Sequence, residues 1–439
     1  MSHLPLFPDL TEAEESGPPA SLPISELRLS RPVRNQVEMI MQELDALIGP
    51  EHRARAIWGL VERLDLSQFY TPIRVATDTP GRAATDPKVL LALWLYATTE
   101  NVGSARHLDR LCQEHDAYRW LRGGVPVNYH MLADFRVSHG EALDELLTQL
   151  LAVLLKEGLA ALDGVAQDGK KVRASAGQSS FRREKSLKGC LEKAQEQVQR
   201  LAREREHPDP LKGKREQAAR ERAAREREEH VAEALRQLPQ VQEIKERQKR
   251  KAGKARAARV TEARVSTTDP EARVMKMPDG GFRPAYNVQL ATDVSSGLVL
   301  GVSVINDGTD QGEAWPMVDQ VVQRTGRVPK RYLMDGGFVD LKDIQALEER
   351  GIEVYAPPKE TEKPVKSKNG WVQGWRERMT TEAAKEVYKQ RAATAEWSNA
   401  QVSQHGVSQF RVRGVAKVTA VMLLVVLAHN LLRWAALGT

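Results

Sequence analysis

Apolar residues in the N-terminal third of the chain recur at three- and four-residue spacing, the period of helices that bury one face. In "ATDPKVLLALWLYATT", Asp86 and Pro87 stand where a helix N-cap and the first helical residue are expected. A long amphipathic stretch follows "GGVP" and begins with Asn128 as a second N-cap. This pattern predicts an all-helical N-terminal domain over residues 31–158.

Short helices joined by a turn in this region fit two structures. One is a DNA-binding helix-turn-helix, in which Asn128, His130 and Arg136 would face DNA. The other is an ordinary helical bundle. The spacing of the apolar residues favours neither, so both remain open.

A period of two begins after Leu162. The segment "LDGVAQDGKKVRASA" has strand composition, and "RPAYNVQLATDVSSGLVLGVSVIND" predicts a hairpin that turns at "VSSG". A helix, the short strand "RYLMD", another helix and the strand "IEVYAPP" follow. Three strands followed by alternating helices and strands predict a mixed α/β sheet flanked by helices, over residues 159–180 and 265–439.

A charged segment at residues 181–264 separates the first predicted strand from the hairpin. We expect "HPDPLKG" and "LPQ" to divide it into about three helices. Its basic end, "KERQKRKAGKARAARV", fits either phosphate contact or a solvated charged face. The first helix carries apolar residues at heptad spacing, which predicts a helical hairpin or small coiled-coil insertion: Leu187, Leu191, Ala194, Val198 and Leu201.

Composition and charge narrow the class of protein. The 439 residues include 65 Lys and Arg against 59 Asp and Glu, a net charge of +6 in which the basic residues are clustered. Clustered cations indicate a polyanionic partner, most often nucleic acid. The two cysteines, Cys112 and Cys190, lie far apart and support neither a disulfide framework nor a zinc site.

The N-terminal segment and the apolar runs favour a cytoplasmic protein. Residues 1–30 hold prolines and acidic residues without periodicity, so we expect a disordered leader and no signal peptide. The most apolar run, Val418 to Ala428, is about half as long as a membrane span. It is therefore predicted to be a buried core helix.

Three carboxylates stand out as candidate chemistry. Asp168 lies in the first predicted strand, Asp335 ends "RYLMD" before a Gly-Gly pair, and Glu396 lies in a late helix among alanines. Carboxylates brought together repel one another unless cations compensate, and Mg²⁺ prefers oxygen ligands. Pairs of such ions serve phosphoryl transfer in nucleases and polymerases. Acids are too common in a chain of this length for their positions alone to assign that chemistry.

Several motifs, found in one order, carry a resemblance to a known family. The segments "VAQDGKKVRASAGQSSFRR", "AYNVQLATD", "YLMDGGF" and "YKQRAATAEWSNAQ" are similar to parts of DDE-type transposases of bacterial insertion sequences. The earlier segment "ATDPKVLLALWLYATTENVGSARHLDRLC" resembles the helical domain that precedes their catalytic domain. The resemblance covers about residues 35–190 and 270–435.

The resemblance implies an RNase H-like catalytic core with two aspartates and a late glutamate. Their order in the family matches Asp168, Asp335 and Glu396, which would be the catalytic residues and the ligands of Mg²⁺, with Mn²⁺ as a possible substitute. Asp163 competes for the first position, but it lies five residues earlier, on the opposite strand face, and outside the "QDG" motif.

Glu382 and Glu386 compete with Glu396, but they stand where acids complement a helix N-terminus. The family signature also places a Tyr and an Arg before its Glu, which Tyr388 and Arg391 match. Five residues turn a helix by about 140°. Arg391 is therefore expected to contact the DNA backbone or to pack against the sheet, away from Glu396.

The family signature places a Lys seven residues after the Glu, where this chain has Ser403, so Arg411 or Arg413 is expected to replace it. Lys170 shares the strand face of Asp168 and is expected nearest the scissile phosphate. The full set of predicted DNA-binding residues is Lys170, Arg173, Arg182, Arg183, Tyr388, Arg391, Arg411, Arg413, Asn128, His130 and Arg136.

These observations predict a transposase that binds the ends of an insertion sequence and cleaves and transfers DNA strands. Its partner would be double-stranded DNA, both terminal inverted repeats and target, and it would act as a homodimer on DNA because joining two ends requires two active sites. No membrane and no small-molecule cofactor are expected, and the protein would be associated with the bacterial nucleoid. A catalytically silent DNA-binding protein derived from a transposase is the alternative, and a coiled-coil scaffold is a third.

Overall fold

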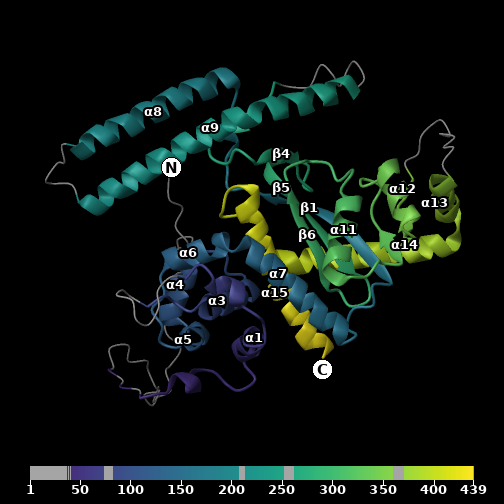
Figure 1. Cartoon of the computed structure of the whole chain (residues 1–439), viewed down its shortest axis with the longest axis horizontal. Helices are drawn as coiled ribbons and strands as arrows, with labels where there is room; N and C mark the ends of the chain where they lie inside the picture. Colours follow the sequence, from purple (N-terminus) through teal and green to yellow (C-terminus); the bar gives the residue numbers. More distant parts are fainter. Residues whose placement is uncertain are drawn as a thin grey trace, which may run out of the picture. The chain divides into compact units, whose positions relative to one another are not determined.

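The computed structural model describes residues 37, 39, 41–73, 83–206, 213–251, 262–358 and 370–438. The predicted leader, residues 1–30, lies outside the described residues. Contacts divide the chain into one unit of residues 1–43 and a second of residues 44–439. The second unit carries the helices and strands described below (Figure 1).

Short helices dominate the region up to residue 156. Asp86 caps α3 by accepting a hydrogen bond from the Lys88 N–H at 2.8 Å, and Pro87 is the first residue of that helix. Asn128 caps α6 through the N–H groups of His130 and Met131, so both predicted caps are confirmed. The elements are η1 (Leu44–Leu47), α1 (Arg53–Val61), α2 (Ser67–Tyr70), α3 (Pro87–Thr99), α4 (Ala105–Glu114), α5 (Asp116–Arg122), α6 (Tyr129–Ser138) and α7 (Gly140–Lys156).

The central sheet has the strand order β6-β5-β1-β7-β8, and β4 pairs with β5 on the same side as β6. β5 runs antiparallel to β1, β4 and β6, whereas β1, β7 and β8 are parallel. This order and direction are those of an RNase H-like sheet, so the predicted fold class is confirmed. The strands are β1 (Gly164–Arg173), β4 (Arg273–Lys276), β5 (Phe282–Asp293), β6 (Val299–Ile305), β7 (Arg331–Leu333) and β8 (Glu353–Tyr355).

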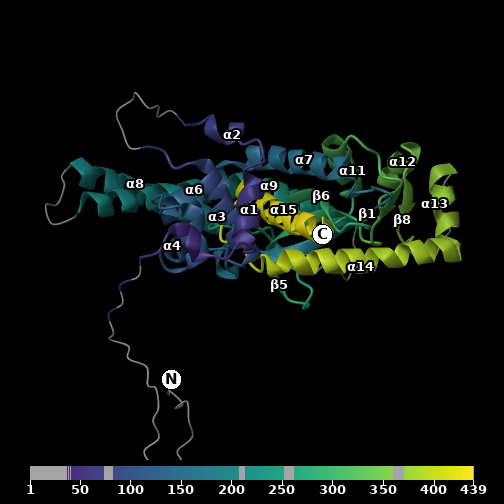
Figure 2. The same cartoon turned by 90° about the horizontal axis from the view of Figure 1, so that it is seen from below.

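Helices cover both faces of this sheet. α14 contacts β1 and β5 on one face, and α11 contacts β5 and β6 on the other. Figure 2 shows α14 along one side of the strands, with α11 and α7 on the opposite side. The helices of this region are α11 (Ala314–Thr325), α12 (Leu341–Glu349), α13 (Gly370–Thr380), α14 (Glu382–Gln404) and α15 (Val415–Leu437).

The apolar run near the C-terminus lies inside α15, which contacts α3, α6, α7 and β6. Among the described residues this helix is long and apolar enough to cross a membrane, yet most of it is buried inside the fold. Asn430 of α15 accepts a hydrogen bond from the Val299 N–H and donates one to its C=O. α15 therefore joins the N-terminal helices to the free edge of β6 and protects that edge from pairing with another chain.

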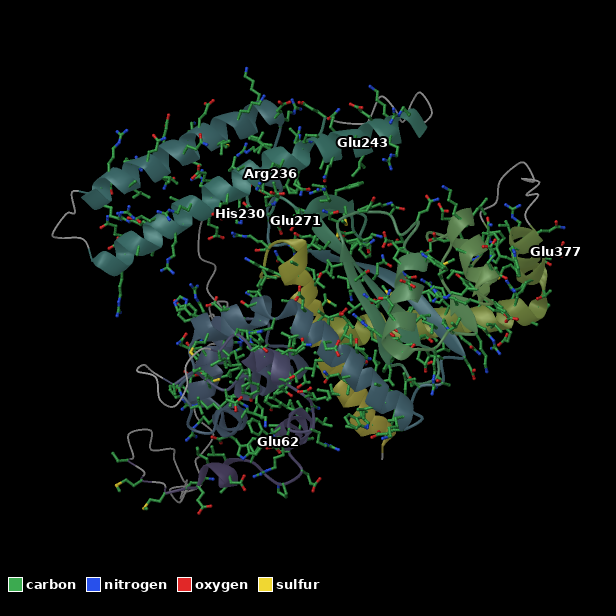
Figure 3. The ribbon with its side chains drawn as sticks, in the orientation of Figure 1. Glu62, His230, Arg236, Glu243, Glu271 and Glu377 are labelled. Carbon is green, nitrogen blue, oxygen red and sulfur yellow. The ribbon has the colours of Figure 1, made fainter. Side chains whose placement is uncertain are left out.

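The charged insertion contains two long helices, α8 (Glu184–Glu206) and α9 (Lys214–Lys251), which pack side by side (Figure 1). The strands that flank it, β2 (Phe181–Arg182) and β3 (Val265–Ser266), pair with each other after the short helix η2 (Gln178–Ser180). Figure 3 shows His230, Arg236 and Glu243 along α9. The exposed faces of both helices carry Lys–Glu or Arg–Glu pairs one turn apart, which explains their charged composition.

The predicted helix break at "LPQ" is wrong, because Pro239 lies inside α9. Proline removes one helical hydrogen bond, but Leu238 and Val241 on either side of it are buried in a cluster with Leu187 of α8 and Val265 of β3. This apolar packing holds the helix through the proline. The heptad residues of α8 are thus covered by α9 of the same chain.

Candidate active site

The pairing of β1 with β7 brings two acids to the same level of the sheet. Val165 is level with Tyr332 and Ala166 with Leu333, in parallel register. Two residues further along both strands, this register places Asp168 beside Asp335. The sequence order predicted both positions, and the sheet makes them neighbours.

Arg391 of α14 lies between the two carboxylates. Its Nη2 is 2.7 Å from Oδ1 of Asp168 and 3.6 Å from Oδ2 of Asp335. The second oxygen of Asp168 accepts a hydrogen bond from Nδ2 of Asn399, at 2.5 Å. One cation therefore offsets two acids. Arg391 was expected to contact the DNA backbone or to pack against the sheet, and this direct contact with Asp168 was not foreseen. The helical spacing gives the angle between Arg391 and Glu396, but it says nothing about which residue of the sheet Arg391 meets.

The burial of Asp168 changes its acidity. Desolvation raises the pKa of its carboxyl above the ordinary value, the Arg391 guanidinium opposes the rise, and the charge of Asp335 adds to it. The ionised form of Asp168 is thus held at a cost.

The carboxylate of Asp335 is fixed by its own turn. Its Oδ1 accepts a hydrogen bond from the Gly337 N–H at 2.6 Å. A Cβ on Gly337 would meet the same oxygen at 2.7 Å, whereas a Cβ on Gly336 would meet Pro357 no closer than 3.5 Å. Gly337 therefore leaves room for the present orientation of Asp335.

Lys170 lies on the same strand face as Asp168, as the alternation predicted. Its Nζ donates to the Asn399 carbonyl at 2.7 Å and contacts Oγ of Ser403. The charged Nζ of Lys170 therefore lies beside Ser403, the position at which the family signature has a Lys. Arg413 instead pairs with Glu226 of the charged insertion, and Arg411 lies beside Arg136.

Glu396 does not join Asp168 and Asp335 in this structure. Ala395 is buried against the sheet, and Glu396, about 100° further round α14, is exposed. Within the described residues Glu396 makes no hydrogen bond or ion pair. The competing acids are also elsewhere: Asp163 pairs with Lys330, Glu382 with Lys385 and Glu386 with Lys389, all near the surface.

A polar cluster that the sequence did not reveal lies on the opposite face of β1. Lys171 forms an ion pair with Asp310 at 3.0 Å, and the same carboxylate accepts hydrogen bonds from Asn287 and Gln289. A Cβ on Gly169 would meet Oδ1 of Asp310 at 2.3 Å and Nε2 of Gln289 at 2.6 Å, so a larger residue there would displace these side chains. The sequence did contain one signal for this cluster: strand alternation places Gly169 and Lys171 on the face opposite to that of Asp168.

The remaining predicted DNA contacts lie on several surfaces. Arg136 is a correction: it is only 7% exposed, because its guanidinium lies over the Trp94 ring and donates to the Gly103 carbonyl inside the helical region, so it does not face outward. Tyr388 is half-buried. Exposed residues of the set are Asn128, His130, Arg173, Arg182, Arg183, Arg411 and Arg413.

The donor set fits a divalent ion in part. Asp168 and Asp335 offer hard oxygen ligands, the kind that Mg²⁺ prefers. Both carboxylates already lie near one positive charge, that of Arg391. Across the described residues, no three His, Cys, Asp or Glu side chains lie close enough to hold a metal ion. Glu396 is the acid that does not fit, since its side chain points away.

The RNase H-like sheet brings two aspartates together at its centre, and the DDE domain match supports an enzyme of the polynucleotidyl transferase or nuclease type. Residues 256–431 match the family model "Transposase DDE domain", and residues 42–138 match "Transposase domain (DUF772)". The two models together cover more than half of the chain, which belongs to the DDE transposases of the bacterial insertion-sequence type. The comparisons with curated proteins and with solved structures found no match.

Asp168 lies outside both matched ranges, because the charged insertion separates β1 from the rest of the sheet. The register of β1 with β7 is therefore the observation that links Asp168 to the matched domain.

Proposed function

We propose that this transposase binds the ends of its insertion sequence and catalyses cleavage and strand transfer through Asp168, Asp335 and Glu396. The observation that carries the proposal is that Asp168 of β1 and Asp335, two residues past the end of the adjacent parallel strand β7, are bridged by Arg391. Two neighbouring carboxylates are stabilised by a cation between them, and phosphoryl transfer also uses cations bound to carboxylates.

Asp168 and Asp335 would hold a divalent ion, Mg²⁺ or Mn²⁺. When bound, such an ion supplies the charge stabilisation needed for in-line displacement at phosphorus. Gly337 orients the Asp335 carboxylate, and Asn399 orients that of Asp168. Arg391, released from the acids, becomes available to a DNA phosphate, which a guanidinium binds in bidentate fashion.

Glu396 would complete the acidic set after a turn of α14 about its axis. Glu396 precedes Asn399 by three residues, which places the two side chains about 60° apart around the helix. A turn of that size brings Glu396 to the side that Asn399 now occupies. The present orientation is held by polar contacts of Arg391, Asn399 and Ser403, for which an added cation would compete. It is also held by the buried Ala395 and Val402, which such a turn would have to shift.

DNA would contact the N-terminal helices through Asn128 and His130 and the catalytic region through Lys170, Arg173 and Tyr388. Arg182, Arg183, Arg411 and Arg413 extend this basic surface. Two copies would assemble on two DNA ends, and the protein would work in the cytoplasm at the nucleoid. Arg183 and Arg413 are partly neutralised by Glu262 and Glu226, so their contribution requires those pairs to open.

The test is strand cleavage of a plasmid that carries the element with its flanking DNA, in Mg²⁺ and in EDTA. Asp168→Asn, Asp335→Asn and Glu396→Gln should each abolish cleavage and leave DNA binding near the wild-type level. Asp163→Asn is the matched control, since that acid lies at the entrance to β1 and pairs with Lys330 at the surface. Cleavage by Asp335→Asn would reject the assignment.

One observation favours a second candidate, the catalytically silent DNA-binding protein. Glu396 is exposed and unattached within the described part of the chain. If the wild-type protein binds end DNA with salt-sensitive affinity but yields no Mg²⁺- or Mn²⁺-dependent nick, this candidate replaces the first.

A further inference from the structure

A small hollow, open to solvent, lies where α3, α6 and α15 meet the segment that follows α14. Its lining includes two arginines, Arg136 and Arg411, that the sequence predicted separately as DNA-binding residues. The residues that matter here are Trp94, Arg136, His405, Gln409, Phe410 and Arg411.

Arg136 is a buried cation without a counter-charge. Its Nη1 donates to the Gly103 carbonyl at 2.7 Å, its guanidinium carbon is 4.5 Å from the centre of the Trp94 ring, and its Nε is buried with no hydrogen-bond partner. In the described part of the chain no carboxylate forms an ion pair with it. A buried unpaired charge is costly, so the site lacks a negative group.

Arg411 adds a second positive charge to the same hollow. Burial and, to a smaller extent, the charge of the nearby Arg411 together lower the pKa of Arg136 to about 10. Arg136 is still charged at neutral pH. Arg411 itself is exposed at the rim, so two guanidiniums stand near each other, one at the base and one at the mouth.

His405 supplies further polar atoms. It is 6% exposed, and neither of its ring nitrogens has a hydrogen-bond partner within normal geometry. Burial lowers the pKa of His405, although the Thr98 backbone opposes the change, so the neutral ring can donate one hydrogen bond. Arg136, buried without a counter-charge, lines this hollow beside a histidine whose nearby acceptor is the Thr98 backbone, and the uncompensated positive charge indicates an anionic ligand.

We propose that this hollow binds a phosphate group, held by Arg136 from the base, Arg411 from the rim and a ring N–H of His405. A tetrahedral oxyanion accepts hydrogen bonds on all sides and balances both guanidiniums. A neutral or apolar ligand would leave the two positive charges uncompensated. This phosphate is either part of a DNA backbone or a free phosphate ion from solution. The DNA alternative rests on the proposed function.

The position of the hollow fits a DNA strand that passes the acids. Phe410 N–H donates to the Arg173 carbonyl at 2.9 Å, and the Gln409 amide donates to the Ala174 carbonyl, so the segment continues from the end of β1. Asp168 is five residues earlier on that strand, about 17 Å at 3.3–3.4 Å per residue. The hollow would hold a phosphate several nucleotides from the one that reacts.

Thermal unfolding of the full chain in inorganic phosphate, against chloride at equal ionic strength, tests the site itself. We expect phosphate to raise the Tm of the wild type and of Arg327→Ala, an exposed arginine outside the hollow. Arg411→Ala, also an exposed change, should lose that response. An equal response in Arg411→Ala and wild type, or none in the wild type, overturns the proposal.

Duplex DNA then distinguishes the two sources. If the ligand is a DNA phosphate, Arg411→Ala should reduce the slope of log affinity against log salt by about one, while Arg327→Ala leaves it unchanged. An unchanged slope with a lost phosphate response assigns the hollow to free phosphate. The phosphate response should persist in Asp168→Asn, so failure of the proposed catalysis would be seen separately.

Discussion

Nη2 of Arg391 lies 2.7 Å from Oδ1 of Asp168, a contact between residues that stand 223 positions apart in the chain. It joins the late helix α14 to the first strand of the sheet. Even with this ion pair, burial and the neighbouring Asp335 raise the pKa of Asp168. The acid is therefore destabilising in its ionised form when no metal is present.

Asp168→Asn should stabilise the metal-free protein at pH 7. The pKa of Asp168 in the folded protein lies above its ordinary value of 3.8. Its ionisation therefore does not lower the free energy of unfolding below about pH 3.8, and lowers it increasingly as the pH rises from there through the folded pKa. Urea unfolding in EDTA should show a larger free energy of unfolding for the variant at pH 7 and a smaller difference near pH 3. Asn399 can turn its unpaired Oδ1 toward the new amide.

Asp163→Asn is the control for that prediction, with the opposite sign. Lys330 lowers the pKa of Asp163, so its ionised form is favourable, and its loss should slightly lower stability at pH 7. Mg²⁺ should raise the Tm of wild type and Asp163→Asn but not that of Asp168→Asn. A wild-type stability greater than that of Asp168→Asn in EDTA would contradict the account.

Ser403→Lys should destabilise the protein by about 1 kcal/mol, because Lys170 already places its Nζ at Ser403. The double variant Lys170→Ser with Ser403→Lys should recover most of the loss, since one cation then remains. Urea unfolding of the four proteins gives the coupling energy between the two positions. Ser408→Lys, an exposed change nearby, is the control, and a coupling energy near zero would rule out the contact.

Gly337→Ala should weaken the response to Mg²⁺ about tenfold or more, a usual effect of disturbing a group that orients a ligand. The new Cβ would stand 2.7 Å from Oδ1 of Asp335 and turn the carboxylate away. Gly336→Ala meets only ordinary contacts and serves as the matched control. The measurement is the Mg²⁺ concentration at half-maximal shift of Tm; equal values for the two variants would refute the orienting role.

Asn430→Ala should lower the free energy of unfolding by about 2–4 kcal/mol, because it leaves the N–H and C=O of Val299 buried without partners. Gln323→Ala removes an exposed hydrogen bond to Asp319 on α11 and should change stability by less than about 0.5 kcal/mol. Equal losses in the two variants would show that the β6 edge does not depend on Asn430.

Local pattern was enough to find most of the long helices and the main strands, and to relate Asp168 and Asp335 to two of those strands. Strand alternation placed Asp168 and Lys170 on one face, and the "RYLMD" strand placed Asp335 at its end; both follow from backbone geometry that repeats every two residues. The N-caps of α3 and α6 also follow from neighbouring residues alone. Motif order, and not periodicity, carried the resemblance to transposases.

What the sequence could not determine was how each helix is turned against its neighbours. The spacing of α14 gives the relative angles of Arg391, Glu396 and Asn399, but the burial of Ala395 and Val402 against the sheet decides which of them meets Asp168. In the same way, packing over Trp94 turned Arg136 inward to the hollow that Arg411 borders. The sequence by itself determined which residues share a face, and only the tertiary structure decided what that face touches, because contacts between distant segments depend on packing that no local period encodes.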